Sequence, residues 1–124
     1  MRSFSLAQLT SLGLLLASCS ASTLAVPDGE ALWRSKYAGC HALDRHAAGP
    51  LHRDVYGRRA GSAPGYRYSS ALAAATVHWD AAALDAWLRD PAAFLPGQGM
   101  YYKVPDAAER AALIEYLRSL GDQH

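Results

Sequence analysis

The chain has 124 residues, which is enough for one small domain. Its 12 basic residues nearly balance its 11 acidic ones, and ten of the 12 are arginines. This composition excludes a strongly basic nucleic-acid-binding surface, so we expect no nucleic acid among the partners.

The first 25 residues have the features of an export signal. Arg2 is the only charged residue before residues 12–17 (LGLLLA), an apolar run too short to span a bilayer and typical of a signal-peptide core. Residues 23–25 (TLA) offer a cleavage site that would leave a leader of residues 1–25 and a domain of residues 26–124. Residues 16–19 (LASC) are similar to a bacterial lipobox, in which the leader is residues 1–18 and Cys19 is lipidated. We favour lipidation, since four positions match directly after the apolar run, and expect a periplasmic protein anchored to a membrane through Cys19.

The folded part then contains a single cysteine, Cys40, which excludes a disulfide framework within it. A lone thiol in an oxidising compartment is a liability unless it has a use. A domain of this size is also often helped by a cofactor or a covalent link. We therefore expect Cys40 to be covalently engaged.

The first predicted helix starts near Asp28, which can cap it, and runs toward Cys40. Residues 42–68 form a long loop rich in Gly, Pro and Arg. Loops of this length are usually functional or disordered. Its packing side chains argue against disorder: Val55, Tyr56, Tyr66 and Tyr68.

Three further helices are predicted in the second half. They cover residues 69–75 with a serine cap, residues 80–91 with an Asp80 cap and a stop at Pro91, and residues 106–120 with an Asp106 cap and Gly121 just past the end. Residues 94–102 form a Pro/Gly loop that carries Met100. No strand pattern appears, so we expect an all-α fold of about four helices with long loops wrapped around something central.

The chemistry is carried by a Cys–His pair and one methionine. Tyr37 stands where a C-x-x-C-H haem-attachment motif would have its first cysteine, so Cys40 alone could form a thioether. His41 would then be placed to bind iron, and a haem electron carrier uses a methionine as the second axial ligand. Met100 is the only methionine after Met1, and it lies among glycines, where the backbone can approach a flat cofactor. Each signal is weak alone, but their order along the chain is specific.

Residues 28–120 resemble class I (monohaem) cytochrome c, of the mitochondrial-like and bacterial short-chain type. The resemblance rests on ordered, nearly evenly spaced motifs: GEALW (29–33), AGCH (38–41), GP (49–50), YGRRAGSAPGYRY (56–68), Trp79, LDAWLRDPAAFLPGQGM (84–100) and ERAALIEYL (109–117). It implies the cytochrome c fold around one haem c and a one-electron carrier rather than an enzyme. The redox partner would be a membrane oxidase or reductase, or a periplasmic enzyme.

The resemblance also implies roles for single residues. Cys40 would bind the haem through one thioether, with His41 as the proximal and Met100 as the distal iron ligand. The Pro50 carbonyl would accept the proton of the His41 ring and fix its orientation. Haem propionates would be hydrogen-bonded or neutralised by Arg58, Tyr68 and Trp79.

Other positions depart from the family pattern. Trp87 replaces the tyrosine that donates toward the methionine sulfur, Gln98 replaces a threonine near a propionate, and Leu72 replaces an asparagine. The docking lysines are missing at Ala92, Ala93 and Gly99, which leaves only Lys36 and Lys103. Strong electrostatic steering of a partner is therefore not expected. The remaining histidines are expected on the surface or in loops (His46, His52, His78 and His124), with His52 where relatives carry an apolar haem-packing residue.

Two alternatives stay open. Loss of one thioether could loosen Met100, and the protein would then bind a small ligand such as CO or NO as a sensor. A haem-free lipoprotein could instead have kept the scaffold, with copper held by Cys40, His41 and Met100.

Overall fold

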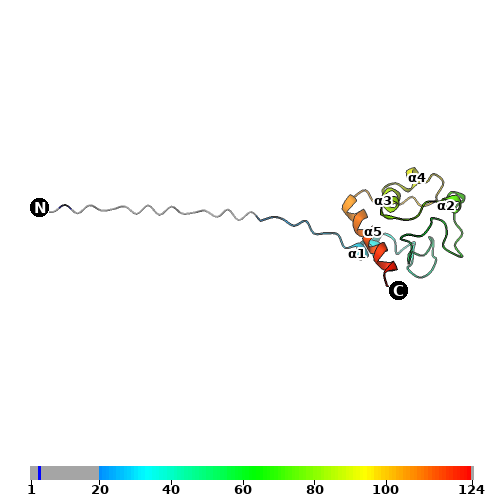
Figure 1. Cartoon of the computed structure of the whole chain (residues 1–124), viewed down its shortest axis with the longest axis horizontal. Coiled ribbons are helices and arrows are strands. Elements are labelled where there is room, and N and C mark those ends of the chain that lie inside the picture. Colours follow the sequence, from blue (N-terminus) through cyan, green and yellow to red (C-terminus); the bar gives the residue numbers. More distant parts are fainter. Residues whose placement is uncertain (1–2, 4–19, 124) are drawn as a thin grey trace.

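The computed structural model describes Ser3 and residues 20–123, and the apolar run of the leader, Cys19 and His124 lie outside them. Within these described residues, five helices occur in the order α1 (Gly29–Lys36), α2 (Ser70–Ala74), α3 (Ala81–Arg89), α4 (Pro91–Phe94) and α5 (Ala107–Gly121). The described residues contain no strand, only one isolated bridge between Arg59 and His78. The prediction of an all-α fold with long loops is confirmed (Figure 1). In this part of the chain, no helix is both long and apolar enough to cross a membrane.

The helix starts are fixed by side-chain caps. The predicted caps all accept a backbone N–H of the first turn: Asp28 from Glu30 and Ala31, Ser69 from Leu72, Asp80 from Ala83, and Asp106 from Glu109. Each satisfies a donor that the helix itself cannot pair. These bonds explain why the helix positions could be predicted.

The helix ends differ from the sequence-based expectation in two places. Pro91 follows the end of α3, but it also begins α4, because Asp90 caps the new helix and proline suits a first helical position. Gly121 was expected just beyond the last helix, but it is the final residue of α5. Asp122 caps that helix at an ordinary φ of −81°, so no residue in the left-handed conformation is needed there.

Helices α1 and α5 pack against each other, as Figure 1 shows. A Cβ at Gly29 would lie 2.1 Å from the Ala112 carbonyl oxygen and 2.9 Å from the Tyr116 Cβ, so only glycine fits. One turn later the buried Trp33 packs on Tyr116, with ring centroids 6.1 Å apart. The first and last helices therefore cross at Gly29 and Trp33 of α1 and at Ala112 and Tyr116 of α5.

A buried arginine joins α3 to α5. Arg110 is 5% exposed, and its guanidinium donates to Asp85 Oδ1 at 2.7 Å and to the carbonyls of Val104 and Pro105 at 3.0 and 2.7 Å. The hydrogen bond from Arg110 holds the pKa of Asp85 below its usual value. This contact also fixes the segment between α4 and α5, which carries Met100.

The long loop between α1 and α2 is ordered by its own hydrogen bonds. Gly57 and Arg58 exchange backbone bonds with Trp79, at 2.9 Å each, and the Tyr66 hydroxyl donates to the Ala48 carbonyl at 2.6 Å. His46 joins the two halves of the loop, with Nε2 2.8 Å from the Pro64 carbonyl oxygen. The loop and the helices together enclose a cavity.

Candidate functional site

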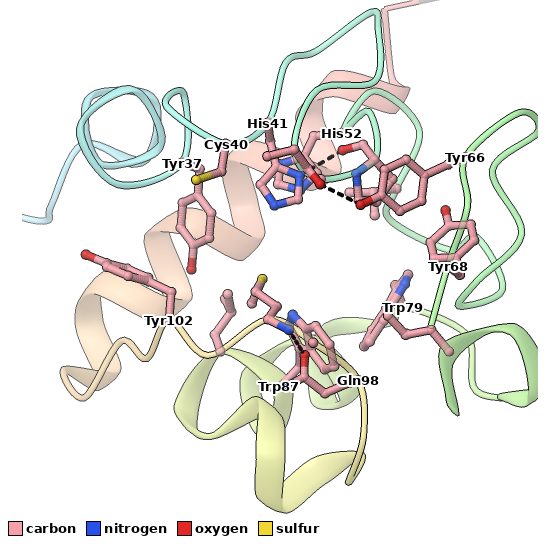
Figure 2. A pocket seen from close by; sticks show the side chains of 18 of the residues that line it. Tyr37, Cys40, His41, His52, Tyr66, Tyr68, Trp79, Trp87, Gln98 and Tyr102 are labelled. Atoms are coloured by element: carbon pink, nitrogen blue, oxygen red, sulfur yellow. Dashed lines mark hydrogen bonds between the residues drawn. The ribbon is translucent and has the colours of Figure 1, made fainter. Parts of the chain in front are cut away.

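A cavity of about 500 Å³ lies between the long loop on one side and α3, α5 and the segment after α4 on the other. This volume is in the usual range of roughly 300–1,000 Å³ for small-molecule and cofactor pockets. All eight residues singled out from the sequence line it: Cys40, His41, Pro50, Arg58, Tyr68, Trp79, Trp87 and Met100. Figure 2 shows His41 and Cys40 on one wall and Trp87 and Gln98 on the opposite wall.

His41 is buried and held in one orientation. Its Nδ1 lies 2.8 Å from the Pro50 carbonyl oxygen, which can only accept, so Nδ1 carries the proton and Nε2 of the neutral ring keeps a lone pair. Burial lowers the pKa of His41 and so favours the neutral ring. The hydrogen bond to the Pro50 carbonyl acts in the opposite direction, but its effect is smaller. His41 can therefore bind a metal through Nε2 from the cavity wall.

Gly49 makes room for this ring, a role that the sequence did not reveal. A Cβ there would lie 2.1 Å from His41 Cε1 and 2.5 Å from Nδ1. The sequence signal is the Gly-Pro pair at residues 49–50 within the long loop, in which a role was assigned to the proline carbonyl and none to the glycine. Both residues hold the same imidazole.

A second imidazole lies against the first. The ring of His52 stacks on His41 with centroids 3.9 Å apart, and its Nδ1 accepts the indole N–H of Trp33 at 2.8 Å. Burial lowers the pKa of His52 well below its usual value, and His41 and Arg58 add to the effect. In the neutral ring the proton is therefore on Nε2, so His52 lacks the free lone pair that His41 has.

Met100 lies in the segment between α4 and α5, half-buried at the cavity. The side chain of Gln98, two residues earlier, accepts the Met100 N–H. Gly97 and Gly99 have φ values of 84° and 93°, in the region that favours glycine. The glycines around the methionine thus shape the turn that brings it to the cavity.

Three buried polar atoms at the cavity have no hydrogen-bond partner: the Tyr37 hydroxyl, Arg58 Nε and Gln98 Nε2. Each can donate a hydrogen bond, and buried donors in native proteins are almost always paired. The other Arg58 nitrogens donate to the Leu51 and Arg53 carbonyls at 3.2 and 3.4 Å. A molecule with an apolar body and hydrogen-bond acceptor groups could fill the cavity and pair with these three donors.

Comparisons with known proteins give one consistent result. No family model matches the chain. Cytochrome c from Sesamum indicum is 36% identical over 97 residues, covering 75% of this chain and 87% of that protein. Cytochrome c from Euglena viridis is 32% identical over 97 residues, covering 76% and 95%. The solved structure of cytochrome cH from Methylobacterium extorquens shares 33% identity, covers 73% of this chain and 94% of its own, and has a TM-score of 0.70.

The chain belongs to the cytochrome c family. As a class I cytochrome c it is a monohaem electron-transfer protein, not an enzyme, and the family implies a c-type haem. The fold predicted from the sequence is the fold of its structural relative.

The cavity of this cytochrome c fits a haem. Its walls are mostly apolar and aromatic, as a porphyrin needs, with Trp79 and Trp87 packed at a ring distance of 5.0 Å. Tyr68 accepts the Ala63 N–H at 3.1 Å and keeps its own proton to donate. The open donors of Arg58 and Gln98 match the carboxylate chemistry of propionates.

Among residues 3 and 20–123, no group of three or more His, Cys, Asp or Glu could hold a metal. The thiol of Cys40 is free and exposed at the edge of the cavity, one residue before His41. The histidines outside the cavity behave as expected from the sequence: His46 belongs to the loop network and His78 is exposed.

Proposed function

We propose that this cytochrome is an exported one-electron carrier, with its haem attached through a single thioether to Cys40 and its iron bound by His41 and Met100. The observation that carries the proposal is the arrangement of His41: its Nε2 lone pair is kept available by the Pro50 bond, with Cys40 beside it and Met100 at the same cavity. When bound, haem supplies the ferric–ferrous couple, and the protein residues hold and insulate it.

Each residue then has a defined task. His41 and Met100 would both bind the iron and leave it without an open site, and a methionine thioether as ligand would favour the ferrous state and raise the potential. Arg58, Tyr68 and Trp79 hydrogen-bond or neutralise the propionates, which would be costly to bury unpaired. Trp87, on the wall opposite His41 in Figure 2, replaces a tyrosine of the family and can donate its indole N–H toward the methionine.

Export is proposed from the sequence of the leader. Residues 1–25 would be removed by one signal peptidase, or residues 1–18 by another, leaving a lipidated Cys19 that anchors the protein to a membrane facing the periplasm. The mass of the N-terminal peptide of the mature protein distinguishes the two: an unmodified Val26 start excludes the anchor.

The redox partner would not need a strongly acidic docking surface. Lys36 pairs with Glu109 at 3.2 Å and Lys103 with Asp90 at 2.7 Å, so both lysines are already neutralised by acids. A membrane oxidase or reductase, or a periplasmic enzyme, would therefore meet this cytochrome without strong steering. Tethering through Cys19 would raise the effective concentration instead.

An optical redox titration of the purified protein tests the electron-carrier proposal. We expect one reversible one-electron transition, and a reduced spectrum that carbon monoxide does not change at neutral pH. A second candidate, binding of a small ligand as a sensor, is favoured by the buried, unpartnered hydroxyl of Tyr37 at the cavity. Carbon monoxide binding by the reduced protein would support this second candidate and contradict stable methionine ligation.

A further inference from the structure

Tyr37 occupies a key position beside the attachment cysteine. Its carbonyl oxygen accepts the backbone N–H of Cys40 at 2.9 Å and that of His41 at 2.8 Å. Tyr37 therefore takes part, through its backbone, in the turn that carries the thiol of Cys40 and the imidazole of His41. Its side chain replaces a cysteine that could have formed a second thioether.

The ring of Tyr37 reaches into the cavity rather than out to solvent. The residue is only 5% exposed, and its hydroxyl is buried without a partner. Burial raises the pKa of Tyr37 strongly, with a further contribution from Tyr102, so the phenol is neutral at physiological pH. A neutral ring at this place can pack against an apolar cofactor edge.

Tyr102 completes the contact from the other side. The two rings meet edge to face, with centroids 5.6 Å apart and planes at 75°. Tyr102 is 45% exposed, so the pair runs from the cavity interior to the surface. Figure 2 shows both rings at one end of the cavity, next to Cys40 and away from Tyr68 and Trp79.

This contact also restrains the segment that carries Met100. Tyr102 lies two residues after Met100, where the chain has no helix. Two residues after Tyr102, the segment is also fixed to α3, because the Val104 N–H donates to the Leu88 carbonyl at 2.8 Å. Anchoring Tyr102 on Tyr37 thus ties the methionine segment to the turn that carries Cys40 and His41.

We propose that Tyr37 and Tyr102 form an aromatic closure of the haem pocket at the edge where a second thioether would otherwise lie, and that Tyr37 is thereby a positioning residue for Met100. The proposal rests on the proposed haem function. Packing between the rings of Tyr37 and Tyr102 would keep Met100 in place and exclude small molecules from the pocket.

The test is an imidazole titration of the ferric, haem-loaded full-length protein, followed by the change in its optical spectrum. An aromatic pair contributes enough to change a displacement equilibrium by up to about tenfold. We expect Tyr37→Ala and Tyr102→Ala each to bind imidazole up to about tenfold more tightly than the unmodified protein. The double variant should bind imidazole no more tightly than either single variant, since both single changes remove the same contact.

Two further variants separate the closure from general effects. Tyr37→Phe keeps the aromatic ring, so this variant should bind imidazole with the same affinity as the unmodified protein. Tyr101→Ala is the matched control, because Tyr101 precedes Tyr102 but is 72% exposed; its affinity should stay within about twofold.

The closure is overturned if Tyr102→Ala, a change at a half-exposed residue, leaves imidazole affinity unchanged, or if Tyr101→Ala raises it equally. Independent, additive effects of the two single changes would also overturn it. Failure of the haem function looks different, because the unmodified protein would then be colourless before any variant is made.

Discussion

At the scale of single residues, the orientation of His41 depends on the absence of a side chain at Gly49. The imidazole reaches the Pro50 carbonyl at 2.8 Å only because position 49 has no Cβ. The hydrogen bond and the empty space therefore select one ring orientation and one tautomer together.

Gly49→Ala should disturb iron ligation. The new Cβ would lie 2.1 Å from Cε1, so the ring must turn or shift and lose its bond to Pro50. We expect a mixture of ligation states in the optical and paramagnetic resonance spectra of the ferric protein. Gly39→Ala is the control, because a Cβ there meets nothing within 4 Å. Identical spectra for both variants would contradict the role given to Gly49.

The sequence predicted some of these residues and missed others for a physical reason. Cys40, His41 and Pro50 lie in short motifs whose spacing determines their relation. The contact of His52 with Trp33 joins residues 19 positions apart, and the path of the loop decides it. The same applies to Tyr37 and Tyr102, which no local pattern connects.

At the scale of helices, the crossing of α1 and α5 supports the site from outside, because α1 leads directly into the turn of Cys40 and His41. Gly29→Ala would place a Cβ 2.1 Å from the Ala112 carbonyl oxygen, which belongs to backbone that cannot easily move. Overpacking of this kind costs about 1–3 kcal/mol. We expect a loss of that size in the free energy of unfolding, measured with urea.

Gly121→Ala provides the opposite case. Gly121 is helical, and a Cβ there would make only an ordinary contact, 3.6 Å from Asp54 Oδ1. Alanine is favoured over glycine within a helix by up to about 1 kcal/mol, so this variant should be neutral or stabilising. A clear loss of stability would contradict the helical conformation assigned to residue 121.

The contact between α3 and α5 should make stability depend on pH in acid. The pKa of Asp85 is lowered mainly by its hydrogen bond from Arg110, so its contribution is fully present above the ordinary value of 3.8 and is lost as pH falls through the lower value of the folded state. Asp85→Asn should cost about 1–2 kcal/mol at pH 7, a discounted figure because a third of the side chain is exposed. The cost should shrink toward pH 2.

Urea unfolding at both pH values measures this difference. Asp44→Asn is the control, since Asp44 pairs with Arg53 at an exposed site. An Asp85 variant with the same small effect as the Asp44 variant at pH 7 would contradict the importance of the buried arginine.

The helices were the most predictable part of the fold. Asp28, Asp80 and Asp106 each stand directly before an amphipathic stretch, and a cap acts within one turn. Helix α4 was not foreseen, because four residues carry too little periodicity to be recognised. The end of α5 was predicted wrongly because glycine can either continue a helix or adopt the left-handed conformation just beyond it, and the sequence alone does not decide between the two.

At the scale of the whole molecule, the net charge is close to zero. Both lysines are paired with acids, and the 12 basic and 11 acidic residues almost cancel. We expect the rate of electron transfer to a small anionic oxidant such as ferricyanide to change by less than about twofold between about 10 and 150 mM salt. Stopped-flow measurement would show it. A steep fall with salt would contradict weak steering and indicate a positive docking face.

The details of the cavity could not be predicted from composition or periodicity. Its existence was expected because long ordered loops in a small domain need something to pack around, and the order of the motifs indicated what that is. Its volume and unpaired donors depend on how distant segments meet, as Arg58 and Gln98 show from opposite halves of the chain.

The most direct test of the central proposal is an alkaline pyridine haemochrome spectrum of the protein purified from its native host, recorded before and after acid–acetone extraction. The account predicts that haem resists extraction and that its α-band lies between those of haem with two thioethers and unattached haem, since only Cys40 is available in the folded domain. Freely extracted haem, or a colourless protein, would contradict the single thioether and favour a site that has lost its attachment.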